Sequence, residues 1–149
     1  MSSNQRETWV LATNTNMCRL YCYSKRLDQL TLLKEIQHPE NKLRDSELTS
    51  DKPGHYQTSG TARGAYSQRT DPKEIKIEDF SREIAKELNC GRSANTYEHL
   101  IVSAAPHMNG LLFQHLNKHV KNLVTHNIKK DVMHFNEREL LVFLHQHNA

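Results

Sequence analysis

The sharpest structural boundary in the sequence is the motif DPKE at residues 71–74. Asp71 is suited to cap a helix, Pro72 to begin it and Glu74 to complete a capping box. Apolar residues follow at spacings of three, four and four, which place them on one helical face: Ile77, Phe80, Ile84 and Leu88. Gly91 is expected to end this helix in a left-handed conformation.

Three stretches before this boundary have the composition of β-strands. They are Thr8–Thr13, Met17–Ser24 and Gln29–His38. Short polar links join them, so an antiparallel meander is favoured over helices. Polar and apolar residues alternate in the second stretch, which places Cys18, Leu20 and Cys22 on one face. Pro39 stops the third stretch, and a polar segment, Glu40–Thr70, follows it.

Strand-like and helix-like stretches alternate after the first helix. Tyr97–Ala105 and Leu123–Ile128 are typical of strands, and His107–Lys118 is typical of a helix. Asn136 and Glu139 form a second capping box at the start of a C-terminal helix. The order β-β-β-α-β-α-β-α predicts the α/β class, with a single mixed five-stranded sheet and helices on both faces in a ribonuclease-H-like arrangement.

Length and composition favour a small protein of the cytoplasm. The 149 residues suit a single domain, residues 1–149, and no run approaches the roughly 18 apolar residues of a membrane span. The N-terminus lacks the pattern of a signal peptide. Cys18, Cys22 and Cys90 contain no CxxC and indicate small buried thiols in a reducing compartment, the alternative being a redox pair or a metal site.

Charge is unevenly distributed along the chain. The net charge of +3 equals that of the acid-free stretch Lys52–Thr70 alone, and a second acid-free run covers His99–Lys130. Acidic residues are concentrated between them, in Asp71–Glu87. Such segregation can present basic surfaces to a polyanion, although solvated basic loops would give the same pattern.

The residues that an enzyme of this fold would need are missing from the expected positions. Two-metal phosphodiester cleavage needs several carboxylates at strand ends, and the first and fourth strands contain none. His115 and His119 are four residues apart on a predicted helix, but the Glu of HExxH and a third ligand are absent. No nucleophile motif or phosphate-binding Gly-rich loop is present. We therefore expect no enzymatic activity, no metal and no cofactor.

The stretch Lys52–Thr70 has a composition that suits an RNA backbone. It contains three of the five glycines, and its cations could neutralise phosphates while its tyrosines stack on bases or ribose. The candidate RNA-binding residues are Lys52, Tyr56, Arg63, Tyr66 and Arg69. The alternative is a disordered surface loop of the same composition.

Several spaced motifs resemble the bacterial family named host attachment protein, or protein required for attachment to host cells. The stretches are HPENKLRDSELTSDKPGH, TDPKEIKIEDFSREIAKEL and HLIVSAAPHMNGLL, and the likeness runs from about Trp9 to His145. The matching residues are Arg44, Asp45, Ser50, Asp51, Pro53, Gly54, Asp71, Pro72, Lys73, Glu74, Phe80, Ala105 and Pro106.

The resemblance implies a relative of the middle domain of archaeal and eukaryotic peptide-chain release factors, which has a ribonuclease-H-like topology. Those factors carry a Gly-Gly-Gln tip on the loop before the first helix, but Gln57 and Gln68 here lack the paired glycines. The resemblance therefore implies a non-catalytic domain that binds RNA or the ribosome.

The sequence leaves other functions and the oligomeric state open. One alternative is a protein–protein interaction factor with an indirect role in host attachment, and a second is a residual nuclease. A dimer could cover an edge of the predicted sheet.

Overall fold

The three N-terminal strands form the predicted antiparallel meander. The computed structural model describes residues 7–38 and 71–149. In it, β1 spans Thr8–Thr13, β2 spans Met17–Ser24 and β3 spans Gln29–Gln37. The link between β1 and β2 is tight because Asn14 Oδ1 accepts hydrogen bonds from the backbone N–H groups of Asn16 and Met17, at 2.8 and 3.0 Å.

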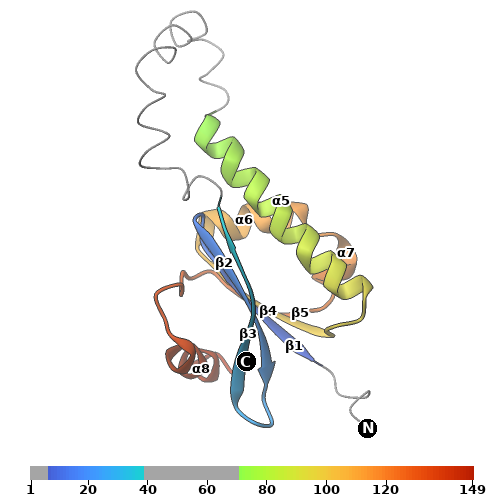
Figure 1. Cartoon of the computed structure of the whole chain (residues 1–149), viewed down its shortest axis with the longest axis vertical. Helices are drawn as coiled ribbons and strands as arrows, with labels where there is room; N and C mark the ends of the chain where they lie inside the picture. Colours follow the sequence, from blue (N-terminus) through green and yellow to red (C-terminus); the bar gives the residue numbers. More distant parts are fainter. Residues whose placement is uncertain (1–6, 39–70) are drawn as a thin grey trace, which may run out of the picture.

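The remaining strands extend the sheet from β1 in the opposite direction. β4 (His99–Ala104) pairs parallel with β1, and β5 (Val124–Ile128) pairs parallel with β4. The strand order is β3-β2-β1-β4-β5 (Figure 1). This is the mixed five-stranded sheet expected from the sequence, and its order and directions are those of a ribonuclease-H-like fold.

Helices cover both faces of the sheet, as predicted (Figure 1). On one face lie α5 (Pro72–Ser93), α6 (Pro106–His115) and α7 (Lys118–Lys121), and on the other lies α8 (Glu137–Gln146). The predicted helix over His107–Lys118 was wrong at its end. Leu116 has an extended backbone, and the Asn117 side chain then accepts a hydrogen bond from the Val120 N–H and caps the short α7. Among the described helices, none is long and apolar enough to cross a membrane.

The two sheet faces form two separate cores that share β1. Trp9 and Leu11 face the first core, with α5, α6 and α7, while Val10 and Ala12 face the second, with α8. Every residue of β1 is buried, as expected for a central strand covered on both sides. Cys18 and Leu20 lie in the first core, and Cys22 is paired with Trp9, so the predicted shared face is confirmed.

Gly91 has a different role from the one predicted. The helix α5 continues to Ser93, and the left-handed residue after it is Asn95, with φ of 60°. At Gly91 the helix meets the Trp9 indole, and a Cβ there would lie 2.6 Å from Trp9 Cη2. The other side of the indole stacks on Tyr97, with ring centroids 4.4 Å apart. Glycine is therefore needed for close approach and not for a left-handed turn.

Asp71 caps α5, but the capping box predicted at this end is not formed. The Asp71 carboxylate accepts a hydrogen bond from the Lys73 N–H at 3.0 Å. Glu74 instead contacts His107 Nε2 at 2.7 Å, which joins the first turn of α5 to α6. The second predicted box is confirmed, because Asn136 and Glu139 exchange side-chain-to-backbone hydrogen bonds of 2.8 and 2.9 Å.

Replacement of Gly91 by alanine should destabilise the protein. The added methyl group would overlap the Trp9 ring, so we expect the free energy of unfolding to fall by about 1–3 kcal/mol. Gly110→Ala is the matched control, because nothing lies within 4 Å of a Cβ at Gly110 in α6. That control should be neutral or stabilising by about 0.5–1 kcal/mol. Urea unfolding measures both, and equal effects of the two variants would contradict the role assigned to Gly91.

Candidate functional site

Most of the residues singled out in the sequence lie outside the described part of the chain. These are Lys52, Tyr56, Arg63, Tyr66 and Arg69 of the basic stretch, and Arg44, Asp45, Ser50, Asp51, Pro53 and Gly54 of the family motifs. Asp71 and Pro72 are described and form the start of α5. His38, the last described residue before this segment, donates its N–H to Asn16 O at 2.9 Å. His38 therefore lies near the carboxyl end of β1.

The carboxyl ends of β1 and β4 are where α/β sheets usually bind ligands, because the strand order reverses between them. Here the polar groups satisfy one another. Asn14 Nδ2 donates to Asp131 Oδ2 at 3.2 Å, and Ser103 Oγ donates to the Lys130 carbonyl at 2.7 Å. Across residues 7–38 and 71–149, no group of three or more His, Cys, Asp or Glu side chains is arranged to hold a metal ion.

His115 and His119 do not form the pair on one helix that their spacing suggested. The break at Leu116–Asn117 leaves His115 at the end of α6 and places His119 on α7. His115 Nε2 is buried and lacks a hydrogen-bond partner. It lies 3.4 Å from Glu78 Oε2, which is close enough for an ion pair but lacks hydrogen-bond geometry.

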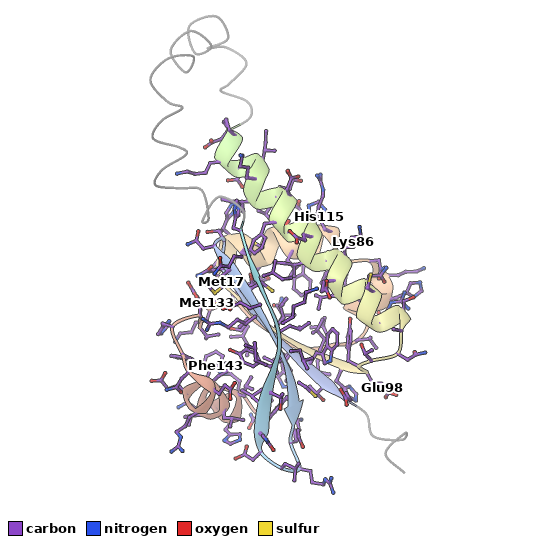
Figure 2. All side chains as sticks on the ribbon, viewed as in Figure 1. Met17, Lys86, Glu98, His115, Met133 and Phe143 are labelled. Carbon is purple, nitrogen blue, oxygen red and sulfur yellow. The ribbon has the colours of Figure 1, made fainter. Side chains whose placement is uncertain are left out.

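His115 lies in a small cleft between α5 and the junction of α6 with α7, which we call the α5–α7 cleft. Its volume is about 230 Å³. Its lining residues are Arg82, Ala85, Lys86, Asn89, His115 and Asn117. Arg82, Lys86 and Asn89 share one face of α5 because they are four and three residues apart. Figure 2 labels Lys86 and His115 close together where α5 passes over α6.

The helix α5 separates its charges between two sides. Glu87 points toward the sheet edge and pairs with Lys34 of β3 at 2.9 Å. On the side of the cleft, the Arg82 guanidinium lies 3.4 Å from Glu78 and 3.3 Å from Asp79. Lys86 is exposed and forms no hydrogen bond or ion pair with the described residues. Lys86 is therefore an unpaired cation on the cleft side of α5, although Arg82 and Lys86 equal Glu78 and Asp79 in number.

The acid-free run at residues 99–130 forms β4, α6, α7 and β5. Its lysines are all exposed: Lys118 and Lys121 on α7, and Lys129 and Lys130 just after β5. Lys118 directly follows Asn117 of the α5–α7 cleft, whereas Lys130 lies at the same end of the sheet as His38.

A larger cavity, which we call the hairpin groove, lies at the opposite end of the sheet. Its volume is about 700 Å³, and its lining combines both charge signs with apolar residues. They are Glu7, Thr8, Cys22, Tyr23, Ser24, Lys25, Arg26, Leu27, His99, Ile101, Thr125 and His126. Its one thiol–carboxylate contact among these lining residues is the hydrogen bond from Cys22 Sγ to Glu7 Oε1 at 3.4 Å, in which the thiol keeps its proton. Neither cavity was predicted, since each is built from residues far apart in sequence.

Cys18 and Cys22 do not provide a nucleophile. Burial, reinforced by the Glu87 carboxylate, raises the pKa of the Cys18 thiol to about 12. Burial and a hydrogen bond from the thiol to Glu7 raise the pKa of Cys22 to about 11. Both thiols are therefore protonated at neutral pH and poorly reactive. Cys90 is exposed, which corrects the expectation that all three cysteines are buried.

Comparison with known proteins gives a family match over most of the chain. The sequence profile of a family described as "Protein required for attachment to host cells" matches residues 9–144. A relative, "Uncharacterized protein RP470" of Rickettsia prowazekii (strain Madrid E), is 32% identical over 83 residues, which are 54% of this chain and 55% of the relative. The match thus spans about half the length of that protein.

A likeness is also found among solved structures. The crystal structure of the archaeal translation termination factor aRF1 aligns with 85% of this chain and 31% of its own, with a TM-score of 0.48 and 9% sequence identity.

Alkylation should distinguish the three thiols. At about pH 8, iodoacetamide should modify Cys90 first, Cys22 slowly and Cys18 only after unfolding, because exposure and thiolate formation both control the rate. Peptide mass spectrometry of a time course measures the order, and the same reaction in concentrated urea is the control. Native Cys18 that reacts as fast as Cys90 would contradict the burial described above.

Proposed function

The chain belongs to the family of proteins required for attachment to host cells, and we propose that it acts as a non-catalytic domain that binds RNA, including the structured RNA of the ribosome. In this proposal the basic loop supplies Lys52, Arg63 and Arg69 for phosphates and Tyr56 and Tyr66 for stacking. The described part of the chain supplies further cations.

The observation that carries this proposal is the placement of the acid-free residues. Residues 99–130 present four exposed lysines and no carboxylate. Two of these lysines, Lys129 and Lys130, follow the carboxyl end of β5, and Lys130 is hydrogen-bonded through its carbonyl to Ser103 of β4. His38, the last described residue before the basic stretch, lies at the same end of the sheet. We propose that these lysines and the basic stretch together give a polyanion one extended basic surface.

The absence of catalysis is part of the proposal. At the carboxyl ends of the parallel strands, Asp131 contacts Asn14 and, among the described residues, belongs to no group of three or more His, Cys, Asp or Glu side chains that could hold a metal ion. Glu35, on β3, is paired with Arg19 Nε at 3.0 Å. Two metal ions would need several carboxylates to hold them. This arrangement supports binding over cleavage, and assays for nuclease and peptidyl-tRNA hydrolysis with Mg²⁺ and Mn²⁺ would test it.

A protein partner is the second candidate, and the edge strand β3 favours it. Leu32 and Leu33 are 44% and 47% exposed on this edge. Leu33 lies at a bulge, because Leu20 pairs with Lys34 and Tyr21 with Leu32. An interaction factor with an indirect role in attachment, or a second copy of the chain, could cover these side chains. A pull-down that survives nuclease and high salt would favour this candidate over RNA.

Charge reversal on the proposed surface should weaken RNA binding. We expect purified ribosomes to retain the protein at low salt, and R63E/R69E or K129E/K130E to reduce binding. On a single-stranded RNA, the slope of log K against log salt should become shallower by about 0.7 for each phosphate that the variant no longer neutralises. Co-sedimentation and fluorescence anisotropy across a salt series measure these effects.

The matched control is K25E/R26E, which changes the charge equally on the exposed turn between β2 and β3. It should bind like the unchanged protein. Absence of binding at low salt, or equal weakening in all three double variants, would refute the proposal.

A further inference from the structure

The α5–α7 cleft is lined by two hydrogen-bond donors, Lys86 Nζ and Asn89 Nδ2, that no described residue engages. The third polar group is His115 Nε2, which makes no hydrogen bond and has the Glu78 carboxylate 3.4 Å away. Nitrogen groups that line one cleft without hydrogen-bond partners are suited to an anion. We propose that this cleft is a binding site for a single phosphate group. The proposal goes beyond the RNA surface described above, because it depends on different residues.

Asn89 is held in one orientation by its neighbours. Its Oδ1 accepts hydrogen bonds from Arg92 Nε at 3.0 Å and from Asn117 Nδ2 at 2.8 Å. Two donors on one oxygen identify that atom as the carbonyl, so the amide nitrogen must be the free end. The Asn117 side chain is itself fixed, because its Oδ1 caps α7. The Asn89 donor is therefore preorganised without a partner.

His115 contributes a nitrogen that is shielded from water. A buried polar atom without a partner is unfavourable, and a ligand oxygen would remove that deficit. Glu78 Oε2 is 3.4 Å away but is shared with Arg82, whose guanidinium lies at the same distance from it. The carboxylate therefore does not satisfy the histidine.

The charges around the cleft favour an anion once all facing groups are counted. Arg82 is balanced by Glu78 and Asp79. Lys86 and Arg92 have no carboxylate partner in the described residues, and Arg92 contacts Asn89. The acidic Glu87 is turned away toward Lys34 of β3. Three cations, Arg82, Lys86 and Arg92, thus face two carboxylates, and one net positive charge remains for a ligand.

The size of the cleft limits what it can hold. Its volume of about 230 Å³ lies below the roughly 300–1,000 Å³ of pockets that enclose drug-sized ligands. A phosphate group suits this space and its donors, since ammonium, amide and imidazole N–H groups all bond to phosphate oxygens. The phosphate could belong to a small phosphate ester or to an RNA backbone, which present the same oxygens to the cleft.

Nuclear magnetic resonance of the ¹⁵N-labelled full chain tests the site directly. Inorganic phosphate, adenosine 5′-monophosphate and a single-stranded RNA oligomer are titrated separately at constant ionic strength. We expect saturable shifts of the His115 imidazole and the Asn89 side-chain amide. Lys86→Gln should weaken the affinity by about tenfold or more, because it removes a charge-assisted hydrogen bond. Lys86 is exposed, so this variant should stay folded.

Arg138→Gln on α8 is the matched control, because it removes one exposed cation on the opposite face of the sheet. It should leave the affinity unchanged. Shifts with phosphate or the nucleotide but not with RNA would support the site and assign it to a small phosphate ester. Shifts with RNA would support it as a backbone contact. No shift of His115 and Asn89 with any of the three ligands, or equal weakening in both variants, would overturn this inference. RNA binding without such shifts would leave the proposed RNA binding intact.

Discussion

Strand β1 is enclosed on all sides, and the rest of the fold depends on this enclosure. It is hydrogen-bonded to β2 on one edge and to β4 on the other, and its two faces supply both cores. The reversal of strand direction occurs across it, since β2 runs antiparallel and β4 parallel. Trp9 then fixes α5 against the sheet by filling the space that Gly91 leaves. Helix, sheet and cleft are therefore positioned from one strand.

The sequence predicted those parts of the fold that local chemistry determines. The alternation of polar and apolar residues around Leu20 specifies a strand, and the capping residues Asp71 and Asn136 specify where two helices begin. Each of these signals spans only a few residues, and the structure confirms all three. The end of α5 was predicted wrongly because glycine is usually taken as a residue that allows a left-handed backbone. Gly91 is instead required by its close contact with Trp9, which is more than 80 residues away in the sequence. No local pattern carries that information.

The candidate site was less predictable for the same reason. The α5–α7 cleft joins residues of α5 to the break between α6 and α7, so spacing alone could not bring Lys86 and His115 together. A weak signal existed in the repeat of Arg82, Lys86 and Asn89 on one helical face. The acid-free run 99–130 was visible in the sequence, but only the fold separates its buried β4 from the exposed lysines of α7. In the folded protein the charges of α5 are separated on the surface, because Glu87 lies toward β3 and Lys86 lies in the cleft beside α7.

The junction between Trp9, Gly91 and Tyr97 has a consequence for how this protein can be observed. Trp9 is the single tryptophan of the chain, and its indole is packed between a helix backbone and a tyrosine ring. The tryptophan fluorescence of the protein therefore comes from one environment, and that environment changes if α5 moves relative to the sheet. The same helix lines the α5–α7 cleft on another of its faces. Trp9 fluorescence can therefore report how α5 packs on the sheet. It can follow the response of this helix to a ligand in the α5–α7 cleft without an added label.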